Sequence, residues 1–440
     1  MPLTHPFLIL HPALCKDLDS NEVQTWAGHR RSHAFIREEG WETNFKINLD
    51  KRLGEKLYIP AGAYNVLECS GGDIRLGPIV GILSSYSHHP VLPSGKKARI
   101  YKELYDAARS KGLFIYRFYP EGVDKRRNLI NGHTYNHHGR LYTGTFPMPD
   151  IVYNRIRYRD IEKRADVKKL LYYFRDKPGV YLFNSRFLNK FEVYRALIHD
   201  TGCAELVPET AILNVYSLKY FLGKYGEVYI KPISNSLGHG IVKVKKRSKD
   251  VYTVQFADSI HQRQKTSVGH VYRYLKQTGI QPSNYLVQKG IDLATLHGRV
   301  FDLRAQVQKD GFGEWTLTGV GVRVAGLNRI VTHIPNGGSA KAYGPVVDHV
   351  FQHMPRARSN IDAQLEFMAK QVPKVLNQRL PIELAILSMD IGLDKQGKLW
   401  LIEVNSKPSY FDEHHIRAVH TKTLIDYFIF SALNNLGGRE

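Results

Sequence analysis

The stretch MDIGLDKQGKLWLIEVNSKP, residues 389–408, decides the fold of this 440-residue chain. Two short apolar runs lie on either side of a Lys-Gln-Gly turn, a pattern that predicts two strands joined as a hairpin. Asp390, Glu403 and Asn405 interrupt these runs at the spacing D-x(12)-E-x-N. Because side chains alternate across a strand, Glu403 and Asn405 share one face.

These three residues are candidate metal ligands. A β-hairpin with solvent-facing acids explains any one of them alone. Two carboxylates and an amide oxygen together, within apolar strands, are the hard oxygen ligands that Mg²⁺ takes when it binds phosphates. The set of three therefore favours a Mg²⁺ site.

The overall composition is that of a soluble globular protein. The chain is 43% hydrophobic and 23% charged, and its length allows two to four domains. No apolar run approaches the roughly 20 residues of a membrane span. The N-terminus lacks a basic start and its apolar stretch contains prolines, so we expect no secretory signal. Cys15, Cys69 and Cys203 have neither disulfide-framework nor zinc-site spacing, which indicates a reduced, cytoplasmic protein.

The formal net charge of +21 predicts an acidic partner, such as a nucleotide, an acidic peptide or polymer, or nucleic acid. The basic residues are scattered, with small clusters at 96–97, 125–127 and 243–247. The sequence has no RNA-binding aromatic signature, zinc finger or basic helix, so nucleic acid is not the favoured partner.

The pattern of apolar runs divides the chain into three parts. Residues 1–75 predict a small β-rich domain, for which a barrel is one form, with strands near 34–36, 45–49 and 56–60. Residues 76–183 predict an α/β domain: a buried parallel strand at 76–83, a helix at 100–111, strands at 113–118 and 150–155, and a helix at 161–174. Residues 184–440 predict mixed α+β structure, with helices at 190–199, 217–224, 361–376 and 418–433 and strands at 228–232, 241–244, 285–288, 301–308 and 315–324.

Lys231 ends an apolar strand directly before the loop 233–240. A lysine at this position can place its ammonium on phosphate oxygens as a point charge. The loop, which contains Ser236 and Gly238, can close over the phosphates and donate backbone N–H groups. A hairpin with an exposed lysine is the alternative. The loop is not a P-loop, because no Gly-Lys-Ser/Thr opens a helix there.

Two further strands carry polar candidates. The strand ending at Gln288 runs into a loop and can offer backbone groups to an adenine edge, although an ordinary edge strand fits as well. In the strand 301–308, Arg304 shares a face with Asp302 and Gln306. Its guanidinium can hold a phosphate or carboxylate bidentately, or form a structural pair with Asp302. Arg323, His333 and residues 336–338 extend the polar set.

Taken together, these features resemble the ATP-grasp superfamily and, more closely, the YheC/YheD-like group of endospore coat-associated proteins. The resemblance covers the chain from about residue 75 onward and lies in residues 75–83, 229–232, 301–304, 333–338 and 402–405. It implies a multidomain α+β and α/β architecture: the small β domain, a pre-ATP-grasp domain at 76–183, and an ATP-grasp domain of two α+β subdomains at 184–440.

The resemblance also implies residue roles. Lys190 and Lys231 are similar to the two nucleotide-contacting lysines, and Gln288, Lys289 and Ile291 to the adenine hinge, with Asp292 as a ribose contact. Ser236, Gly238 and Asn336 complete the expected nucleotide-binding set, and Asp390, Glu403 and Asn405 are the expected ligands of two Mg²⁺ ions, with Mn²⁺ as an alternative. Some ligase members carry an arginine where this chain has Ser388, so Arg304 or Arg323 is expected to supply that catalytic charge.

The expected activity is ATP-dependent ligation of a carboxylate to an amine through an acyl phosphate, with release of ADP. The implied partners are ATP, a carboxylate substrate and an amine acceptor, among them an acidic peptide or a spore coat protein. The resemblance places the protein in the mother-cell cytoplasm and the spore coat. The alternative is a nucleotide-binding or structural coat component without ligase activity. A third hypothesis, a nucleic-acid-binding protein, is supported by the net charge alone.

Overall fold

The computed structural model describes residues 7–10, 22–38, 46–70, 73–85, 95–136, 138–234, 239–332 and 337–436. The chain divides into two compact units. Unit 1 comprises residues 1–186, 309–314 and 421–440, and unit 2 comprises residues 187–308 and 315–420. The boundaries expected at residues 75 and 183 stay a prediction. None of the helices in the described ranges combines the length and apolar character that a membrane crossing requires.

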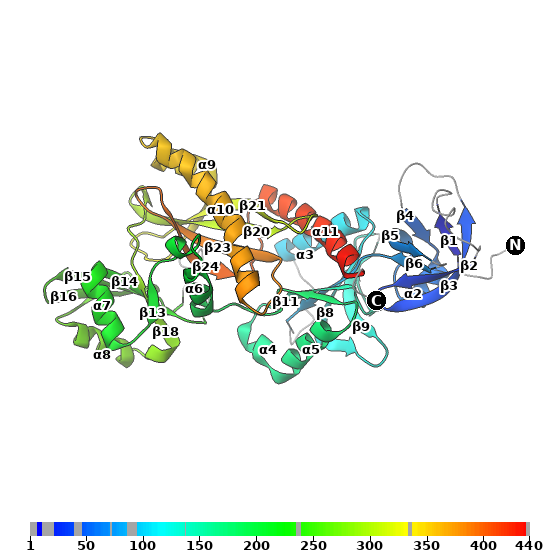
Figure 1. Cartoon of the computed structure of the whole chain (residues 1–440), viewed down its shortest axis with the longest axis horizontal. Helices are drawn as coiled ribbons and strands as arrows, with labels where there is room; N and C mark the ends of the chain where they lie inside the picture. Colours follow the sequence, from blue (N-terminus) through cyan, green and yellow to red (C-terminus); the bar gives the residue numbers. More distant parts are fainter. Residues whose placement is uncertain are drawn as a thin grey trace. The chain divides into compact units, whose positions relative to one another are not determined.

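Unit 1 begins with a closed six-stranded barrel (Figure 1). Its strands, in spatial order, are β1 (Phe7–Leu10), β3 (Arg30–Glu38), β2 (Glu22–Ala27), β6 (Asp73–Leu76), β5 (Gly62–Ser70) and β4 (Lys46–Leu49). The strand expected at 56–60 is wrong, because the helix α2 (Lys51–Leu57) occupies part of that stretch. The Asp50 side chain accepts hydrogen bonds from the Arg52 and Leu53 amides and so starts this helix.

A six-stranded sheet follows the barrel, in the order β10, β9, β8, β7, β11, β12. Its strands are β7 (Ile79–Ser84), β8 (Phe114–Asp124), β9 (Leu129–Tyr135), β10 (Leu141–Pro147), β11 (Ile151–Arg155) and β12 (Tyr181–Phe183). The strand β7 is buried throughout and pairs in parallel with β8 and β11, as the apolar run predicted. That run is divided, because Leu76 lies in β6 of the barrel and β7 starts at Ile79.

Helices cover both faces of this sheet (Figure 1). The helix α3 (Gly95–Ser110) and the part of α11 (His414–Leu436) from residue 421 lie on one face, where Tyr105 packs on Tyr135 and Phe428 on Phe183. The helices α4 (Arg159–Lys163) and α5 (Ala165–Asp176) lie on the other face, where Phe174 packs on Phe118. The single helix expected at 161–174 is therefore wrong: the chain leaves helical geometry at Arg164, with φ −58° and ψ 141°.

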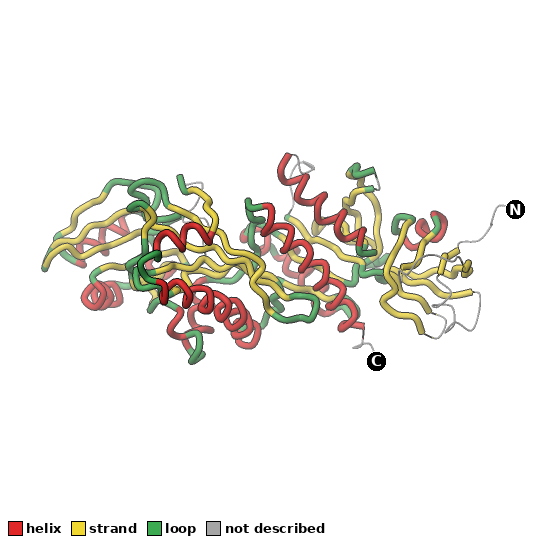
Figure 2. Tube along the Cα trace, turned by 90° about the horizontal axis from the view of Figure 1, so that it is seen from above, coloured by secondary structure: helices red, strands yellow, loops and turns green. Residues whose placement is uncertain are grey.

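Unit 2 contains two antiparallel sheets. The first has the order β13 (Thr210–Ile212), β18 (Tyr285–Lys289), β14 (Glu227–Pro232), β15 (Val242–Ser248), β16 (Val251–Phe256) and β17 (Gln262–Lys265). The helices α7 (Val215–Tyr225) and α8 (Val268–Gln277) pack against it, and Figure 2 shows them along one side of its strands. Their contact buries Leu218, Phe221 and Val271 against Val228 and Ile230.

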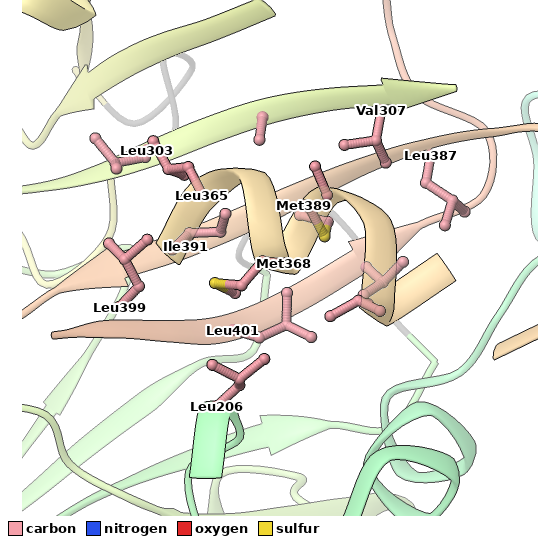
Figure 3. Close-up of a cluster of buried hydrophobic side chains, with 14 of the residues drawn as sticks. Leu206, Leu303, Val307, Leu365, Met368, Leu387, Met389, Ile391, Leu399 and Leu401 are labelled. Atoms are coloured by element: carbon pink, nitrogen blue, oxygen red, sulfur yellow. The ribbon is translucent and has the colours of Figure 1, made fainter. Parts of the chain in front are cut away.

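The second sheet has the order β22 (Ser339–Ala342), β21 (Trp315–Val324), β20 (Arg299–Lys309), β23 (Ile386–Leu393) and β24 (Leu399–Asn405), and β19 (Thr295–Leu296) pairs with β20. The helix α10 (Pro355–Arg379) covers its apolar face (Figure 3). There Leu303, Met389 and Leu401 meet Leu365 and Met368 of the helix. Because side chains alternate along these strands, the opposite face is left to their polar residues.

Shorter elements complete unit 2. They are the helices α6 (Lys190–Ile198) and α9 (Tyr343–Val350) and the 3₁₀ turns Ala204–Leu206 and Pro282–Asn284.

Candidate functional site

Strand register brings the predicted metal ligands together. In the hairpin of β23 and β24, Asp390 lies opposite Glu403 and Ser388 lies opposite Asn405. Directly opposed residues of paired strands project from the same face. Asp390, Glu403 and Asn405 therefore share the polar face of the second sheet. A β-bulge next to Asp390 adjusts the register of this pair relative to the rest of the hairpin.

The neighbouring strand β20 extends the polar face. Arg304 lies opposite Asp390, so that Arg304, Asp390 and Glu403 form one row across three strands. Asp302 lies opposite Gly392 in the next row. All of these residues lie on the side that α10 does not cover.

A pocket lies between this polar face and the first sheet of unit 2. Its empty volume is about 760 Å³, open solvent at the mouth included. Residues from both sheets and from the segments between them line it, among them Tyr229, Lys231, Gln288, Lys289, Ile291, Leu293, Asp302, Thr332, Asp390, Ile402 and Glu403.

Lys231 supplies a buried cation to this pocket. Lys231 is only 8% exposed, and its Nζ donates a hydrogen bond of 2.7 Å to Oε1 of Gln288. Gln288 in turn donates from Nε2 to the Thr210 hydroxyl at 3.0 Å. Burial lowers the pKa of Lys231 to about 8, although the negative charge of Glu403 acts in the opposite direction.

Lys190 supplies a second cation. It is the first residue of α6, where the Asn189 side chain caps the helix through the Glu192 amide. The Nζ atom of Lys190 lies 3.0 Å from Oε1 of Glu403, and the two side chains are 12% and 20% exposed. Lys190, Lys231 and Glu403 line an adjoining pocket together. Two lysines and one of the expected metal ligands thus occupy one site.

Asp302 adds a third carboxylate, which the sequence analysis did not assign to the site. Burial, together with the negative charge of Asp390, raises the pKa of Asp302 to about 7. The Thr332 hydroxyl donates a hydrogen bond to Asp302 and opposes this shift. Such an accumulation of negative charge around buried oxygens is what a divalent cation relieves.

The oxygen donors fit Mg²⁺. Within the described ranges, no three His, Cys, Asp or Glu side chains gather as a metal-binding group by themselves. A cation held by Asp390 and Glu403 would therefore need the amide oxygen of Asn405 and oxygens from its ligand. This suits Mg²⁺, which usually binds through one or two carboxylates together with phosphates and water. Oδ1 of Asn405 accepts a hydrogen bond of 2.9 Å from the Lys407 amide, which orients its side chain.

The expected adenine-contacting residues divide into two groups. Lys289 and Ile291 line the pocket, and the Lys289 ammonium lies 4.6 Å from the centre of the Trp400 ring. Asp292 is not among the lining residues: its carboxylate lies 2.9 Å from the Lys395 ammonium, and its side chain is 74% exposed. Ser236, Gly238 and Asn336, like His333, lie outside the described residues.

The two expected catalytic arginines lie on the second sheet, outside the lining of the pocket. Nη1 of Arg323 lies 3.0 Å from Oε1 of Glu413. The pKa of Glu413 is lowered, because hydrogen bonding and attraction to Arg323 outweigh the effect of burial. Arg304 and Arg323 both lie 5.7 Å from the centre of the Phe411 ring. The structure shows no ion pair between Arg304 and Asp302 in the described ranges, and Asp302 bonds to Thr332 instead.

Among the residues at this site that were not assigned a role from the sequence are three with polar contacts: Thr210, Asp302 and Thr332. The alternation that places Asp302 beside Arg304 on one face was a usable signal for Asp302. The sequence held no comparable signal for Thr210 and Thr332, because only the tertiary fold brings them to the site. Thr210 is 78 residues from its partner Gln288, and Thr332 is 30 residues from its partner Asp302.

Fold and site together define an ATP-grasp protein: the YheC/D like ATP-grasp family matches residues 179–430, and the chain belongs to this family. The expected fold class is thereby confirmed. Among curated proteins, the chain is similar to the endospore coat-associated protein YheD of Bacillus subtilis (strain 168), with 26% identity over 406 residues that cover 90% of this chain and 87% of YheD. It is also similar to the endospore coat-associated protein YheC of the same organism, with 23% identity over 309 residues that cover 70% of this chain and 84% of YheC.

A similar solved structure is the VanG D-Ala:D-Ser ligase from Enterococcus faecalis. The TM-score is 0.45 and the identity is 12%, over 82% of this chain and 99% of the ligase chain.

Proposed function

We propose that the protein is an ATP-dependent carboxylate–amine ligase that works through an acyl phosphate and releases ADP. One observation carries the proposal: a pocket between two antiparallel sheets places the buried Lys231 across from Asp390 and Glu403. A buried cation facing partly buried acids in a cleft is the arrangement expected of a functional site.

Lys190 and Lys231 bind the triphosphate in this proposal. Both ammonium groups are largely buried, and charge-assisted hydrogen bonds to phosphate are stronger in such surroundings. Ile291, Leu293 and Ile402 give the pocket an apolar wall suited to the adenine ring. Gln288 holds Lys231 in place through the 2.7 Å hydrogen bond.

Asp390, Glu403 and Asn405 would hold Mg²⁺. A magnesium ion bound there would neutralise charge on the phosphate oxygens. A metal on Glu403 would weaken the attraction of its carboxylate for the Lys190 ammonium, whose N–H donors would then be more available to a phosphate. The Lys190–Glu403 pair therefore links the cation site of the chain to its anion site.

The reaction needs no nucleophilic side chain. A carboxylate oxygen of the substrate attacks the γ-phosphorus of ATP, and the bond to the ADP oxygen breaks. The amine nitrogen then attacks the acyl carbon, phosphate leaves with the bonding electrons, and the nitrogen loses a proton to form the amide. The chain positions the reactants and stabilises the transferred charge. Arg304, in one row with Asp390 and Glu403, is the residue we assign to the acyl phosphate.

The substrates we propose are acidic peptides of the spore coat, with the mother-cell cytoplasm and the forming coat as the location. The support is the net charge of +21 and the similarity to two endospore coat-associated proteins.

The proposal is tested by nucleotide binding and turnover. ATP with Mg²⁺ should raise the melting temperature of the wild-type protein, because a ligand that binds only the native state stabilises it. Amino acids and acidic peptides, screened together, should then elicit ADP release. A melting temperature unchanged at millimolar ATP and Mg²⁺ contradicts the assignment of the site. A shift without turnover for any acceptor favours the inactive coat component.

A further inference from the structure

Unit 1 contains a half-buried arginine without an acidic partner. Nη2 of Arg117 donates a hydrogen bond of 3.0 Å to the Tyr119 hydroxyl. Its guanidinium carbon lies 5.2 Å from the centre of the Tyr101 ring and 5.5 Å from that of the Tyr119 ring. In the described part of the chain, no carboxylate forms an ion pair with Arg117. By contrast, Arg75 pairs with Asp150 in the same unit.

A partly desolvated charge surrounded by neutral groups has an electrostatic cost. Tyrosine rings and hydroxyls offset part of this cost, but they leave the positive charge uncompensated. An incoming anion would supply the missing charge.

The position of Arg117 in the sheet is one at which ligands bind. Arg117 on β8 lies opposite Ile82 of β7, and the parallel pairing of these strands ends one residue later. On the other side of β7, its last residue, Ser84, lies opposite Arg155, the last residue of β11. Ile82 and Ser84 are two residues apart on β7, so Arg117 and Arg155 project from the same face. They stand on the two sides of the carboxyl end of β7, on strands about 10 Å apart.

The connectivity places a topological switch point between β7 and β11, at their carboxyl ends. The chain leaves β7 through α3 and enters β8 on one side, whereas it leaves β11 through α4 and α5 and enters β12 on the other side. In open α/β sheets, ligands bind outside the carboxyl ends of the strands at such a point. Because α3 covers the face that bears both arginines, it brings Tyr101 to this end of the sheet.

The groups around the two arginines belong to one cluster. Nη1 of Arg155 donates a hydrogen bond of 3.1 Å to the Tyr153 hydroxyl. Burial raises the pKa of Tyr153, and both Arg155 and Tyr101 act on it electrostatically. Tyr101 is thus close to the surroundings of Arg117 and of Arg155. The two guanidiniums and their tyrosines therefore lie on one face of the sheet, at the carboxyl end of β7.

We propose that Arg117 and Arg155, together with Tyr101 and Tyr119, bind a carboxylate group at the carboxyl end of β7. A guanidinium offers two parallel N–H donors that match a carboxylate, and aromatic rings accommodate the carbon chain that carries it. Only the assignment of this carboxylate to the substrate of the ligase rests on the proposed function. The bound carboxylate would belong to an acidic peptide.

The test compares peptide binding by four full-length proteins: wild type, Arg117→Gln, Arg117→Lys and Arg140→Gln. Arg140 is an exposed residue directly before β10 of the same sheet, so its variant removes the same charge without touching the cluster. The probes are triglutamate, triglutamine and inorganic phosphate, titrated calorimetrically at about 0.15 M salt, where contacts between exposed charges are screened.

Triglutamate should bind the wild type and Arg140→Gln with the same affinity within about twofold, and Arg117→Gln at least about tenfold more weakly. Arg117→Lys keeps the charge but loses the planar fork, so its affinity should lie between the two. If Arg117→Gln fails to fold, the comparison of Arg117→Lys with the wild type still tests the proposal. Triglutamine should not bind, and phosphate should bind more weakly than triglutamate.

Equal triglutamate affinity in the wild type and Arg117→Gln, or equal binding of triglutamine, would overturn the proposal. Phosphate binding tighter than triglutamate binding would overturn the choice of a carboxylate. The thermal shift with ATP and Mg²⁺ should be the same in all four proteins. Its absence from all four would contradict the proposed function and leave the carboxylate site to be judged on the peptide titrations.

Discussion

Lys190 and Glu403 form an ion pair of 3.0 Å between two residues that the proposed function assigns to opposite partners. The lysine is expected to bind phosphate and the glutamate to bind Mg²⁺. The two side chains are mostly buried, so a metal on Glu403 and a phosphate on Lys190 would each compete with this contact. Binding of the metal and of the nucleotide should therefore depend on each other.

Glu403→Gln tests this dependence. Gln still offers a carbonyl oxygen to Lys190, so the free energy of unfolding without ligand should fall by only about 1 kcal/mol. The missing charge should weaken ATP binding in the presence of Mg²⁺ by at least about tenfold, since the metal loses a carboxylate ligand. Glu366→Gln, an exposed position on α10, is the control with the same charge change. Mg²⁺ titrations of the ATP-induced melting shift measure both effects, and indistinguishable curves for the two variants would contradict the metal assignment.

Lys231 should couple ATP binding to proton uptake. Burial lowers its pKa to about 8, so at pH 8 the side chain is charged in about half of the molecules. The phosphates of bound ATP favour the charged form and raise this pKa. Binding at pH 8 should therefore take up about half a proton, and binding at pH 6.5 almost none. Calorimetry in buffers with different ionisation enthalpies measures this uptake. Lys231→Met should show none at pH 8, and an unchanged uptake in that variant would assign the proton to another group.

The same pKa predicts a pH dependence of stability without ATP. The folded-state pKa of Lys231 is about 8, below the ordinary lysine value of 10.5, so between these pH values the unfolded chain binds more protons than the folded one. The free energy of unfolding should consequently rise with pH across this window, relative to Lys231→Met. Urea denaturation of both proteins at pH 7, 8, 9 and 10 gives the difference. A difference that stays constant over this range would show that Lys231 is not desolvated.

Arg75 and Asp150 should be important for the stability of unit 1. Their ion pair of 2.5 Å joins side chains that are 8% and 6% exposed, and Asp150 also accepts a hydrogen bond of 2.8 Å from the Ile79 amide at the start of β7. Asp150→Ala leaves the arginine charge buried without its partner and should cost about 3–5 kcal/mol. Asp166→Ala removes the partner of Arg164 in an exposed pair and should change stability little. Urea denaturation compares them, and equal midpoints would contradict this difference.

Local patterns predicted the parts of the site that lie on regular strands. Alternation alone placed Glu403 and Asn405 on one face, and the apolar strand before Lys231 gave that lysine its position. The errors have local causes as well. Lys56–Pro60 looked like a strand because the capping by Asp50, six residues earlier, was not taken into account. The hairpin of β9 and β10 was overlooked, although Asn136 and Gly139, the latter with φ +71°, form its turn.

Local sequence patterns could not predict contacts between residues that are far apart in the chain. The partner of Lys190 is 213 residues away, and that of Lys231 is 57 residues away. The resemblance to a family supplied the roles of these residues, but the Lys190–Glu403 pair and the shifted pKa of Asp302 follow only from the folded chain.

Lys231→Ala should sharply lower the rate of ADP formation, because it removes a charge-assisted contact to the reacting phosphates. Hydrogen bonds to charged groups contribute about 1.5–3 kcal/mol, or roughly ten- to more than a hundredfold in rate or affinity. Lys246→Ala, in an exposed part of β15, is the control and should keep wild-type turnover. Steady-state ADP release with saturating acceptor is the measurement. Full activity of Lys231→Ala would show that the lysine does not contact the phosphates.

The most direct test of the ligase assignment is the fate of the phosphates of ATP in the presence of Mg²⁺, amino acids and acidic peptides whose carboxylates carry ¹⁸O. The account predicts equal amounts of ADP and phosphate, with one ¹⁸O atom from the carboxylate in each phosphate released, and neither product from Glu403→Gln. AMP and pyrophosphate as the main products, or phosphate without ¹⁸O, would contradict the acyl phosphate.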